Sequence, residues 1–289
     1  MKITDIFKRQ EKTFSFEFFP PKGYSSTLEL GINIGQLIKL APSFISVTYG
    51  AGGTTQDLSF DLIEYIQHKI GITAMAHYTC INASKTKVES DLDMLFSKNI
   101  LNLMLLRGDL PQQGFKGLNQ EFRHASDLIA LARSKNRYCI GAAGYPEKHP
   151  ESLDIDSDLK WLKNKVDQGA DFIITQMFFD NDHYFNFVDK ARRFGIKTRI
   201  IPGIMPITNF KQIKKFSEMC GATIPQRIIT ALESIQHDST ALYSAGVDFA
   251  IEQCVDLLKR GAPGLHFYTL NKSRATVDIF SSLPHALIH

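Results

Sequence analysis

The sequence predicts an α/β fold, a (β/α)8 TIM barrel with an extra helix before the last strand. Short apolar runs recur eight times, amphipathic stretches lie between them, and 289 residues over eight units give about 36 residues each, close to the usual barrel unit. Runs that are apolar on both faces are typical of strands buried in a parallel sheet. The predicted strands are 14–19, 44–48, 73–78, 101–106, 138–143, 172–176, 199–204 and 264–270.

Helical stretches separate these strands. Apolar residues follow Asp57, Ser90 and Ser126 at helical spacing, and later stretches lead to glycines, of which Gly169 suits a helix C-cap. The segment 224–258 is longer than one helix, so it holds the extra helix. Strands that alternate with helices imply βα units with right-handed crossovers. The apolar positions lie within 58–66, 92–96, 128–131, 159–166, 185–191 and 251–258.

A doubly wound open sheet is the structural alternative. Such a sheet usually carries a Gly-rich turn after its first strand. The first predicted strand ends instead in Glu17-Phe18-Phe19-Pro20-Pro21. The sequence also contains no G-x-G-x-x-G, G-x-x-x-x-G-K-[ST] or G-x-S-x-G motif, so we expect no Rossmann site, P-loop or hydrolase elbow.

Composition and charge exclude several classes of protein. Lys and Arg total 33 and Asp and Glu 30, so the net charge is +3, and 44% of residues are hydrophobic. These values exclude a disordered chain and argue against a nucleic-acid partner. No run of 18 apolar residues and no signal-peptide pattern occurs, so we expect no membrane partner. Four scattered cysteines predict a reduced, cytoplasmic protein, and His77 with Cys80 is too little for a metal site.

Polar residues gather where the predicted strands end, which is where barrels carry their reactive groups. One carboxylic acid, an Arg/Asp pair and several aromatic and amide groups suit a flat polar ligand, so we expect an enzyme. The residues at these ends are Glu17, Thr48, Tyr49, Gly50, His77, Thr79, Arg107, Gly108, Asp109, 145–149, Gln176, 202–206 and Tyr268.

Glu17 and the Arg107-Gly108-Asp109 run are the strongest chemical candidates. Glu17 lies within Phe-Ser-Phe-Glu-Phe-Phe, and a carboxyl that is costly to ionise among Phe side chains can act as a general acid near neutral pH. A structural ion pair is the alternative. Gly108 permits a close backbone approach to a ligand, Asp109 can place charge beside a cofactor ring, and Arg107 can hold a phosphate. An ordinary turn is the alternative there.

Taken together, these segments resemble the methylenetetrahydrofolate reductases of the bacterial type. The matching motifs run in the family's order over almost the whole chain, and together they are specific. They are 16–21 (FEFFPP), 46–50 (SVTYG), 76–80 (AHYTC), 106–109 (LRGD), 125–128 (ASDL), 145–150 (YPEKHP), 165–170 (KVDQGA), 174–176 (ITQ), 202–206 (PGIMP) and 266–271 (HFYTLN).

The resemblance implies a single catalytic FAD-binding barrel over residues 1–289, without a regulatory domain. It implies an oxidoreductase that reduces 5,10-methylenetetrahydrofolate to 5-methyltetrahydrofolate with NADH or NADPH, by ping-pong hydride transfer through FAD. This reaction feeds methionine synthesis, and the enzyme is expected to be a homo-oligomer. In this reading Glu17 is the general acid that opens the folate ring at N10, and Asp109 stabilises the resulting cation.

Binding residues are carried over by the same resemblance. The expected FAD contacts are Thr48, Tyr49, Ala51, His77, Arg107, Gly108, Asp109, His124, Ala125, Tyr145, His149, Ser152, Asp158 and Lys165. The expected substrate contacts are Thr48, Asp109, Gln176, Gln212, Phe216, Tyr268 and Lys272.

Four positions depart from the family's pattern. His124 stands where Tyr is common, Trp161 and Asn164 replace Asn and Arg, and Lys272 replaces Arg, so it cannot form a bidentate carboxylate fork. Without an Arg at position 164, Lys165 is left more alone to hold a phosphate. Two other functions compete with the reductase. A non-redox folate- or nucleotide-binding barrel draws on the departures at Asn164 and His124, and a metal-dependent hydrolase barrel would need clustered His and Asp ligands.

Overall fold

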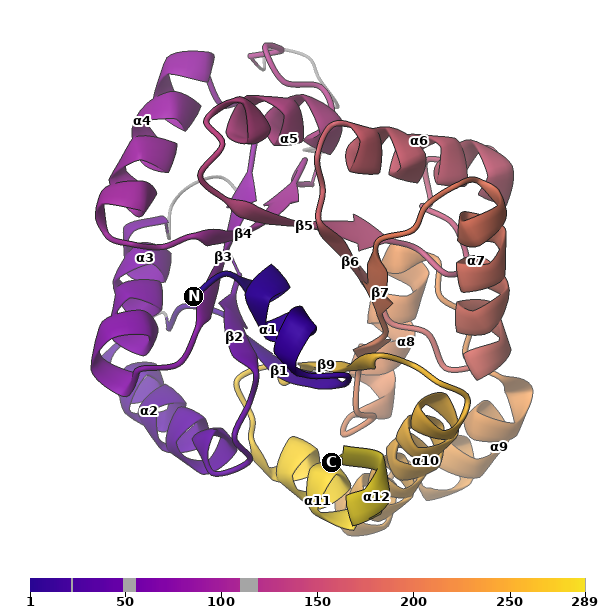
Figure 1. Ribbon diagram of the computed structural model, residues 1–289. Coiled ribbons are helices and arrows are strands. Elements are labelled where there is room, and N and C mark those ends of the chain that lie inside the picture. Colours follow the sequence, from indigo (N-terminus) through magenta and orange to yellow (C-terminus); the bar gives the residue numbers. More distant parts are fainter. Residues whose placement is uncertain (22, 49–55, 110–118, 289) are drawn as a thin grey trace.

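The computed structural model describes residues 1–21, 23–48, 56–109 and 119–288. Within these residues, nine parallel strands form a nearly closed barrel surrounded by helices, which confirms the predicted fold class (Figure 1). Their order is β7-β6-β5-β4-β3-β2-β1-β9-β8. The strands are β1 (Thr13–Phe18), β2 (Phe44–Val47), β3 (Ala74–Thr79), β4 (Asn102–Leu106), β5 (Cys139–Gly144), β6 (Phe172–Thr175), β7 (Arg199–Ile201), β8 (Gly203–Ile204) and β9 (Gly264–Tyr268).

The predicted strand 199–204 is in fact two strands, separated by Pro202. Proline has no backbone N–H and cannot continue a hydrogen-bonded ladder. β7 pairs with β6 on one side, and β8 pairs with β9 on the other. The carbonyl of Pro202 still accepts a hydrogen bond from the His266 N–H at 2.9 Å. This short segment therefore joins both ends of the strand order and brings the barrel close to closure.

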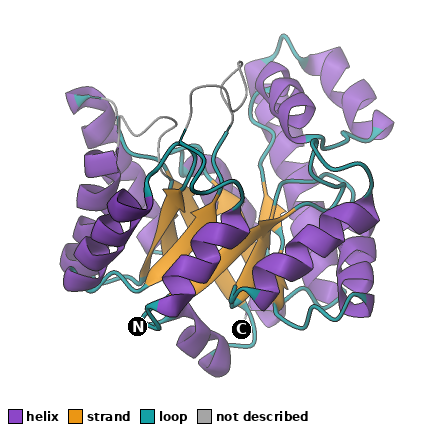
Figure 2. Cartoon of the chain, turned by 90° about the horizontal axis from the view of Figure 1, so that it is seen from above, coloured by secondary structure: helices purple, strands orange, loops and turns teal. Residues whose placement is uncertain are grey.

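The helices cover the outside of the strands (Figure 2). The extra helix before the last strand is confirmed, because both α9 and α10 precede β9. The helices are α1 (Ile3–Arg9), α2 (Tyr24–Ile38), α3 (Gln56–Tyr65), the π-helix η2 (Ile66–Ile70), α4 (Lys85–Ser97), α5 (Ala125–Ser134), α6 (Ile155–Asp167), α7 (Asn181–Arg193), α8 (Phe210–Cys220), α9 (Gln226–Ile235), α10 (Ser239–Lys259), α11 (Arg274–Ser282) and α12 (His285–Ile288). Within the described parts of the chain, no helix has the length and apolar character needed to cross a bilayer.

Helix α1 closes the N-terminal end of the barrel, a role that the sequence analysis did not predict (Figure 1). Ile3 and Ile6 pack with Phe44 and Phe172 in one buried cluster. The Ile3 N–H donates to the Asn102 side-chain oxygen at 2.8 Å, which ties the helix to β4. With this end filled, the open end of the barrel is the one where the strands finish.

The alternation along β1 separates core from site. Phe14, Phe16 and Phe18 pack against the helix layer in the main hydrophobic core. Ser15 and Glu17 point to the other face, toward the barrel interior, because successive side chains of a strand alternate. A single strand therefore supplies both core phenylalanines and a reactive carboxyl.

Candidate active site

A cavity of about 1050 Å³ lies at the C-terminal ends of the strands. Most of the residues predicted from the sequence line it. They are Glu17, Thr48, His77, Arg107, Gly108, Asp109, His124, Ala125, Tyr145, His149, Ser152, Asp158, Lys165, Gln176, Phe216 and Tyr268. Gln212 and Lys272 are not among its lining residues, and Tyr49 and Ala51 lie outside the described residues.

Glu17 faces two imidazoles at the bottom of this cavity. Its Oε2 atom lies 3.4 Å from His77 Nε2 and 3.5 Å from His266 Nε2, and its side chain is 17% exposed. The expectation that phenylalanine side chains surround Glu17 is wrong, because Phe16 and Phe18 point to the opposite face of the strand. A carboxyl between two imidazoles has direct partners with which to exchange a proton.

His77 is nearly buried beside this carboxyl. Burial lowers the pKa of His77 from its ordinary value; the negative charge of Glu17 opposes this shift, and the charge of His266 adds to it. His77 is therefore a neutral imidazole at pH 7. The contact with Glu17 lacks the geometry of a hydrogen bond, so Nε2 of His77 is a buried atom without a hydrogen-bond partner among the described residues.

His266 was missed by the sequence analysis, although its register could have revealed it. It lies two residues before Tyr268 on β9, so the strand period of two turns both side chains to the same face. Its Nδ1 atom is 2.8 Å from the Ser15 hydroxyl. The ring stacks on Phe44 with centroids 6.2 Å apart, so contacts on several sides hold it beside Glu17.

Arg107 is held by an acidic residue that the sequence analysis did not name. Its guanidinium donates two hydrogen bonds to Glu151, at 2.7 and 2.6 Å. The carboxylate raises the pKa of Arg107, and the guanidinium lowers the pKa of Glu151. Gly108 follows in a left-handed conformation with φ of +91°, and a Cβ there would lie 2.7 Å from the Ile81 side chain. A phosphate at Arg107 would therefore share the guanidinium with Glu151 or displace it.

A second polar group lies between β5 and α6. Lys165 donates to the Ala143 carbonyl at 2.6 Å. Burial lowers the pKa of Lys165 to about 8, and Asp158 opposes that shift. Asp158 itself accepts a hydrogen bond from Ser152 at 2.9 Å. Burial and the charge of Asp158 raise the pKa of Tyr145 to about 12, so its phenol remains a donor at neutral pH.

The side chain of Tyr268 reaches from β9 to β6, past the β7–β8 segment that lies between them. Its hydroxyl donates to the Thr175 carbonyl at 2.6 Å, directly before Gln176. Gly203 makes this approach possible, since a Cβ at that position would lie 2.3 Å from the Thr175 oxygen and 2.6 Å from Cε2 of Tyr268. The side-chain oxygen of Gln176 accepts from the Met177 N–H at 2.8 Å, which leaves its amide nitrogen to donate toward the cavity.

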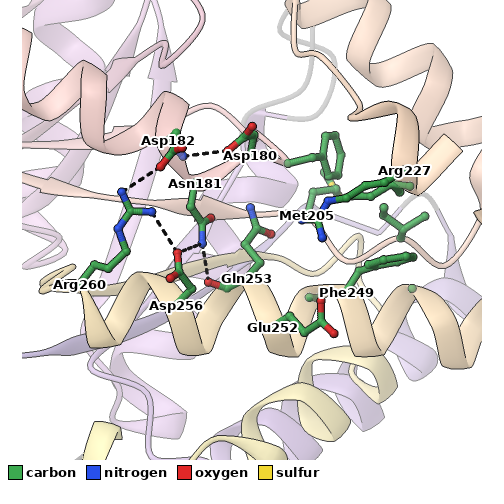
Figure 3. Close-up of a pocket in the computed structure, with 15 residues that line it drawn as sticks. Asp180, Asn181, Asp182, Met205, Arg227, Phe249, Glu252, Gln253, Asp256 and Arg260 are labelled. Atoms are coloured by element: carbon green, nitrogen blue, oxygen red, sulfur yellow. Dashed lines mark hydrogen bonds and ion pairs between the residues drawn. The ribbon is translucent and has the colours of Figure 1, made fainter.

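A smaller cavity of about 320 Å³ lies between α7, α9 and α10, and Met205 lines both cavities. Its polar side chains bond to one another (Figure 3). Arg260 bridges Asp182 at 2.9 Å and Asp256 at 3.2 Å, and the Asn181 amide donates to Asp256 at 2.7 Å. Among the described residues, Met205 is the one predicted strand-end residue that lines it, and none of the predicted catalytic, FAD or substrate contacts does, so we place the candidate active site in the larger cavity.

Across the described ranges, no three His, Cys, Asp or Glu side chains gather in a way that could hold a metal ion. The large cavity instead offers one carboxyl between imidazoles, one buried ammonium and several aromatic rings.

Comparisons with known proteins agree with the motifs. The family model for methylenetetrahydrofolate reductase matches residues 2–284. The chain is 38% identical to methylenetetrahydrofolate reductase (NADH) 1 of Arabidopsis thaliana, over 98% of this chain and 50% of that protein. It is 37% identical to the 5,10-methylenetetrahydrofolate reductase of Escherichia coli strain K12, over 93% of this chain and 90% of that protein.

The chain spans about half the length of the plant relatives that it matches. The expectation of one catalytic domain without a regulatory one stays a prediction. Among solved structures, an uncharacterised protein from Clostridium thermocellum that binds two copies of 5-methyl-5,6,7,8-tetrahydrofolic acid superposes with a TM-score of 0.65. The match covers 100% of this chain and 98% of that one at 14% identity, so it supports the fold alone.

Proposed function

The chain belongs to the methylenetetrahydrofolate reductase family, and on that basis we propose that it reduces 5,10-methylenetetrahydrofolate to 5-methyltetrahydrofolate. FAD would occupy the large cavity, and NADH or NADPH would supply the electrons. The observation that carries the proposal is the carboxyl of Glu17 between two imidazoles, at the bottom of a cavity open at the strand ends.

The residues present fit a flavin nucleotide. The cavity, about 1050 Å³, combines aromatic and apolar walls with the buried ammonium of Lys165. Lys165 and Arg107, which both line the cavity, would hold the diphosphate. FAD, when bound, would carry a hydride from the nicotinamide to the one-carbon unit of the folate. Two substrates that use one cavity in turn give ping-pong kinetics.

Glu17 would supply the proton for the folate half of the reaction. Opening of the folate's five-membered ring at N10 needs a proton donor within hydrogen-bond reach. His266 lies 3.5 Å from the Glu17 carboxyl and can return a proton to it. The neutral His77, at 3.4 Å, would help to hold the carboxyl in place. The cation that ring opening leaves on the folate would be stabilised by the negative charge of Asp109, which lies exposed in the cavity wall.

The amide of Gln176 and the ring of Phe216 would orient the substrates above Glu17. Both residues line the cavity, and each comes from a different element. Assembly as a homo-oligomer, a cytoplasmic location and a role in methionine synthesis belong to the same proposal.

Anaerobic half-reactions test this function. Purified protein, reconstituted with FAD if necessary, should be yellow, lose its flavin absorbance with NADH or NADPH, and regain it with 5,10-methylenetetrahydrofolate. Protein that cannot bind FAD would overturn the proposal. Protein that binds FAD stoichiometrically but turns over neither substrate would instead indicate the non-redox binding barrel.

A further inference from the structure

Two exposed aromatic rings stack on each other at the wall of the large cavity. Trp161, the single tryptophan of the chain, and His124 have ring centroids 5.0 Å apart and an interplanar angle of 21°. Both line the cavity, and Trp161 is 51% exposed. A large indole that stays half exposed beside a polar cavity is not part of the core and offers a ring face to a flat ligand.

The two rings come from two neighbouring helices, α5 and α6. α5 and α6 lie side by side (Figure 1). His124 is the N-cap of α5, and its N–H donates to the Asp127 carboxylate at 2.9 Å. Trp161 lies on α6, and the ring of His124 backs one face of its indole. A ring already held in place loses little conformational freedom when a ligand stacks on it.

The same face of α6 carries two further polar groups. Asp158 precedes Trp161 by three residues and Lys165 follows it by four, which places all three on one side of the helix. All three line the cavity. An acceptor, a flat ring and a cation in this arrangement match the hydroxyls, the base and the phosphates of a nucleotide.

We propose that Trp161, backed by His124, is the stacking platform for the adenine ring of FAD; this inference rests on the proposed function. The base lies on the open face of the indole. Asn164 carries no charge, so Lys165 is the cation that this face of α6 directs into the cavity. Stacking on Trp161 adds affinity and selects FAD over FMN, which lacks the adenine.

The sole tryptophan gives a direct readout of this contact. We would titrate the flavin-free protein with ADP and follow tryptophan emission, because ADP does not absorb that emission and a flavin does. Saturable quenching by ADP is expected. Flavin fluorescence then gives the affinities of the variants for FAD and FMN.

Substitutions separate stacking from folding. Loss of one base–aromatic stack weakens binding by about 5- to 150-fold. Trp161→Asn should therefore weaken FAD binding by about that factor and leave FMN binding unchanged, and Trp161→Phe should restore most of the loss. Tyr65→Ala is the matched control, since Tyr65 is 55% exposed on α3 and does not line the cavity. Circular dichroism would show that each variant folds.

Two results would overturn the inference while leaving the proposed function intact. One is wild-type protein that binds FAD but shows no quenching by ADP. The other is a Trp161→Asn variant that binds FAD as tightly as the wild type, or loses FMN affinity equally. Wild-type protein that binds no FAD would instead defeat the proposed function, whatever the behaviour of ADP.

Discussion

His266 Nε2 lies 3.5 Å from the Glu17 carboxylate, across the pairing of β9 with β1. The opposite ring nitrogen of His266 is 2.8 Å from the Ser15 hydroxyl. Ser15 and Glu17 alternate with the core phenylalanines of β1. The same strand therefore supplies the carboxyl and the hydroxyl that hold the two ring nitrogens of His266. The position of the carboxyl therefore depends on the strand register of the barrel rather than on a flexible loop.

Glu17→Gln should separate the two half-reactions. The amide keeps the shape of the carboxyl but cannot give up a proton, so reduction of the folate should fall by about 10²- to 10⁴-fold. Flavin reduction by the nicotinamide needs no proton from Glu17 and should be nearly unchanged. Stopped-flow absorbance of each half-reaction measures both rates. An equal loss in the two would assign Glu17 a structural role.

His266→Gln tests whether the imidazole positions Glu17 and exchanges a proton with it. We expect the folate half-reaction to slow by about tenfold, less than the loss of the acid itself, with an altered pH profile. Ser15→Ala keeps the imidazole and should slow the folate half-reaction less than His266→Gln does. The nicotinamide half-reaction serves as the internal control. A uniform drop in both rates with an unaltered pH profile would contradict the positioning role.

The sequence predicted the residues of this site better than their surroundings. Strand-end positions such as Glu17 and Gln176 could be predicted, because a buried parallel strand is a short apolar run and the first polar residues mark its end in the sequence. The neighbours of Glu17 could not be read from adjacent residues, since alternation sends Phe16 and Phe18 to the other face. His266 lies 249 positions away along the chain and meets Glu17 only through the β1–β9 pairing.

Three other features could not be predicted from the sequence for similar reasons. Pro202 indicates a break in the predicted strand 199–204. Only the three-dimensional structure shows that the residues before the break pair with β6 and the residues after it pair with β9. Glu151 lies in a loop, 44 residues from Arg107, and no periodicity marks a loop residue as an ion-pair partner. Trp161 was noticed only as a departure from the family, whereas the structure shows it stacked on His124.

Gly203→Ala should destabilise the protein. The added Cβ would lie 2.3 Å from the Thr175 oxygen and 2.6 Å from Cε2 of Tyr268, and both are fixed by their own hydrogen bond. Overpacking of this kind costs about 1–3 kcal/mol, so the free energy of unfolding measured in urea should fall by that amount.

Gly35→Ala is the matched control for that substitution. Gly35 is exposed on α2, and apart from the backbone of its own helix a Cβ there would meet no atom of the described residues within 4 Å. Since Ala is the better helix former, this variant should gain up to about 1 kcal/mol. Equal unfolding free energies in the two variants would show that the Tyr268 contact is not tight.

Lys165 should make both nucleotide binding and stability depend on pH. Burial lowers its pKa from 10.5 to about 8 in the folded protein. The ammonium is therefore lost as the pH rises through about 8, and the affinity for ADP, which needs that positive charge beside the phosphates, should fall over the same range.

Folding stability should change in the opposite direction. Between pH 8 and 10.5 the unfolded chain holds a proton on Lys165 that the folded chain has released, so the free energy of unfolding gains a positive contribution as the pH rises. Lys165→Met should raise stability at pH 7, abolish this contribution and weaken ADP binding below pH 8. Lys160→Met, at an exposed position of the same helix, is the control and should change neither profile. An ADP affinity that stays constant from pH 7 to 9 in the wild type would show that Lys165 does not contact the phosphates.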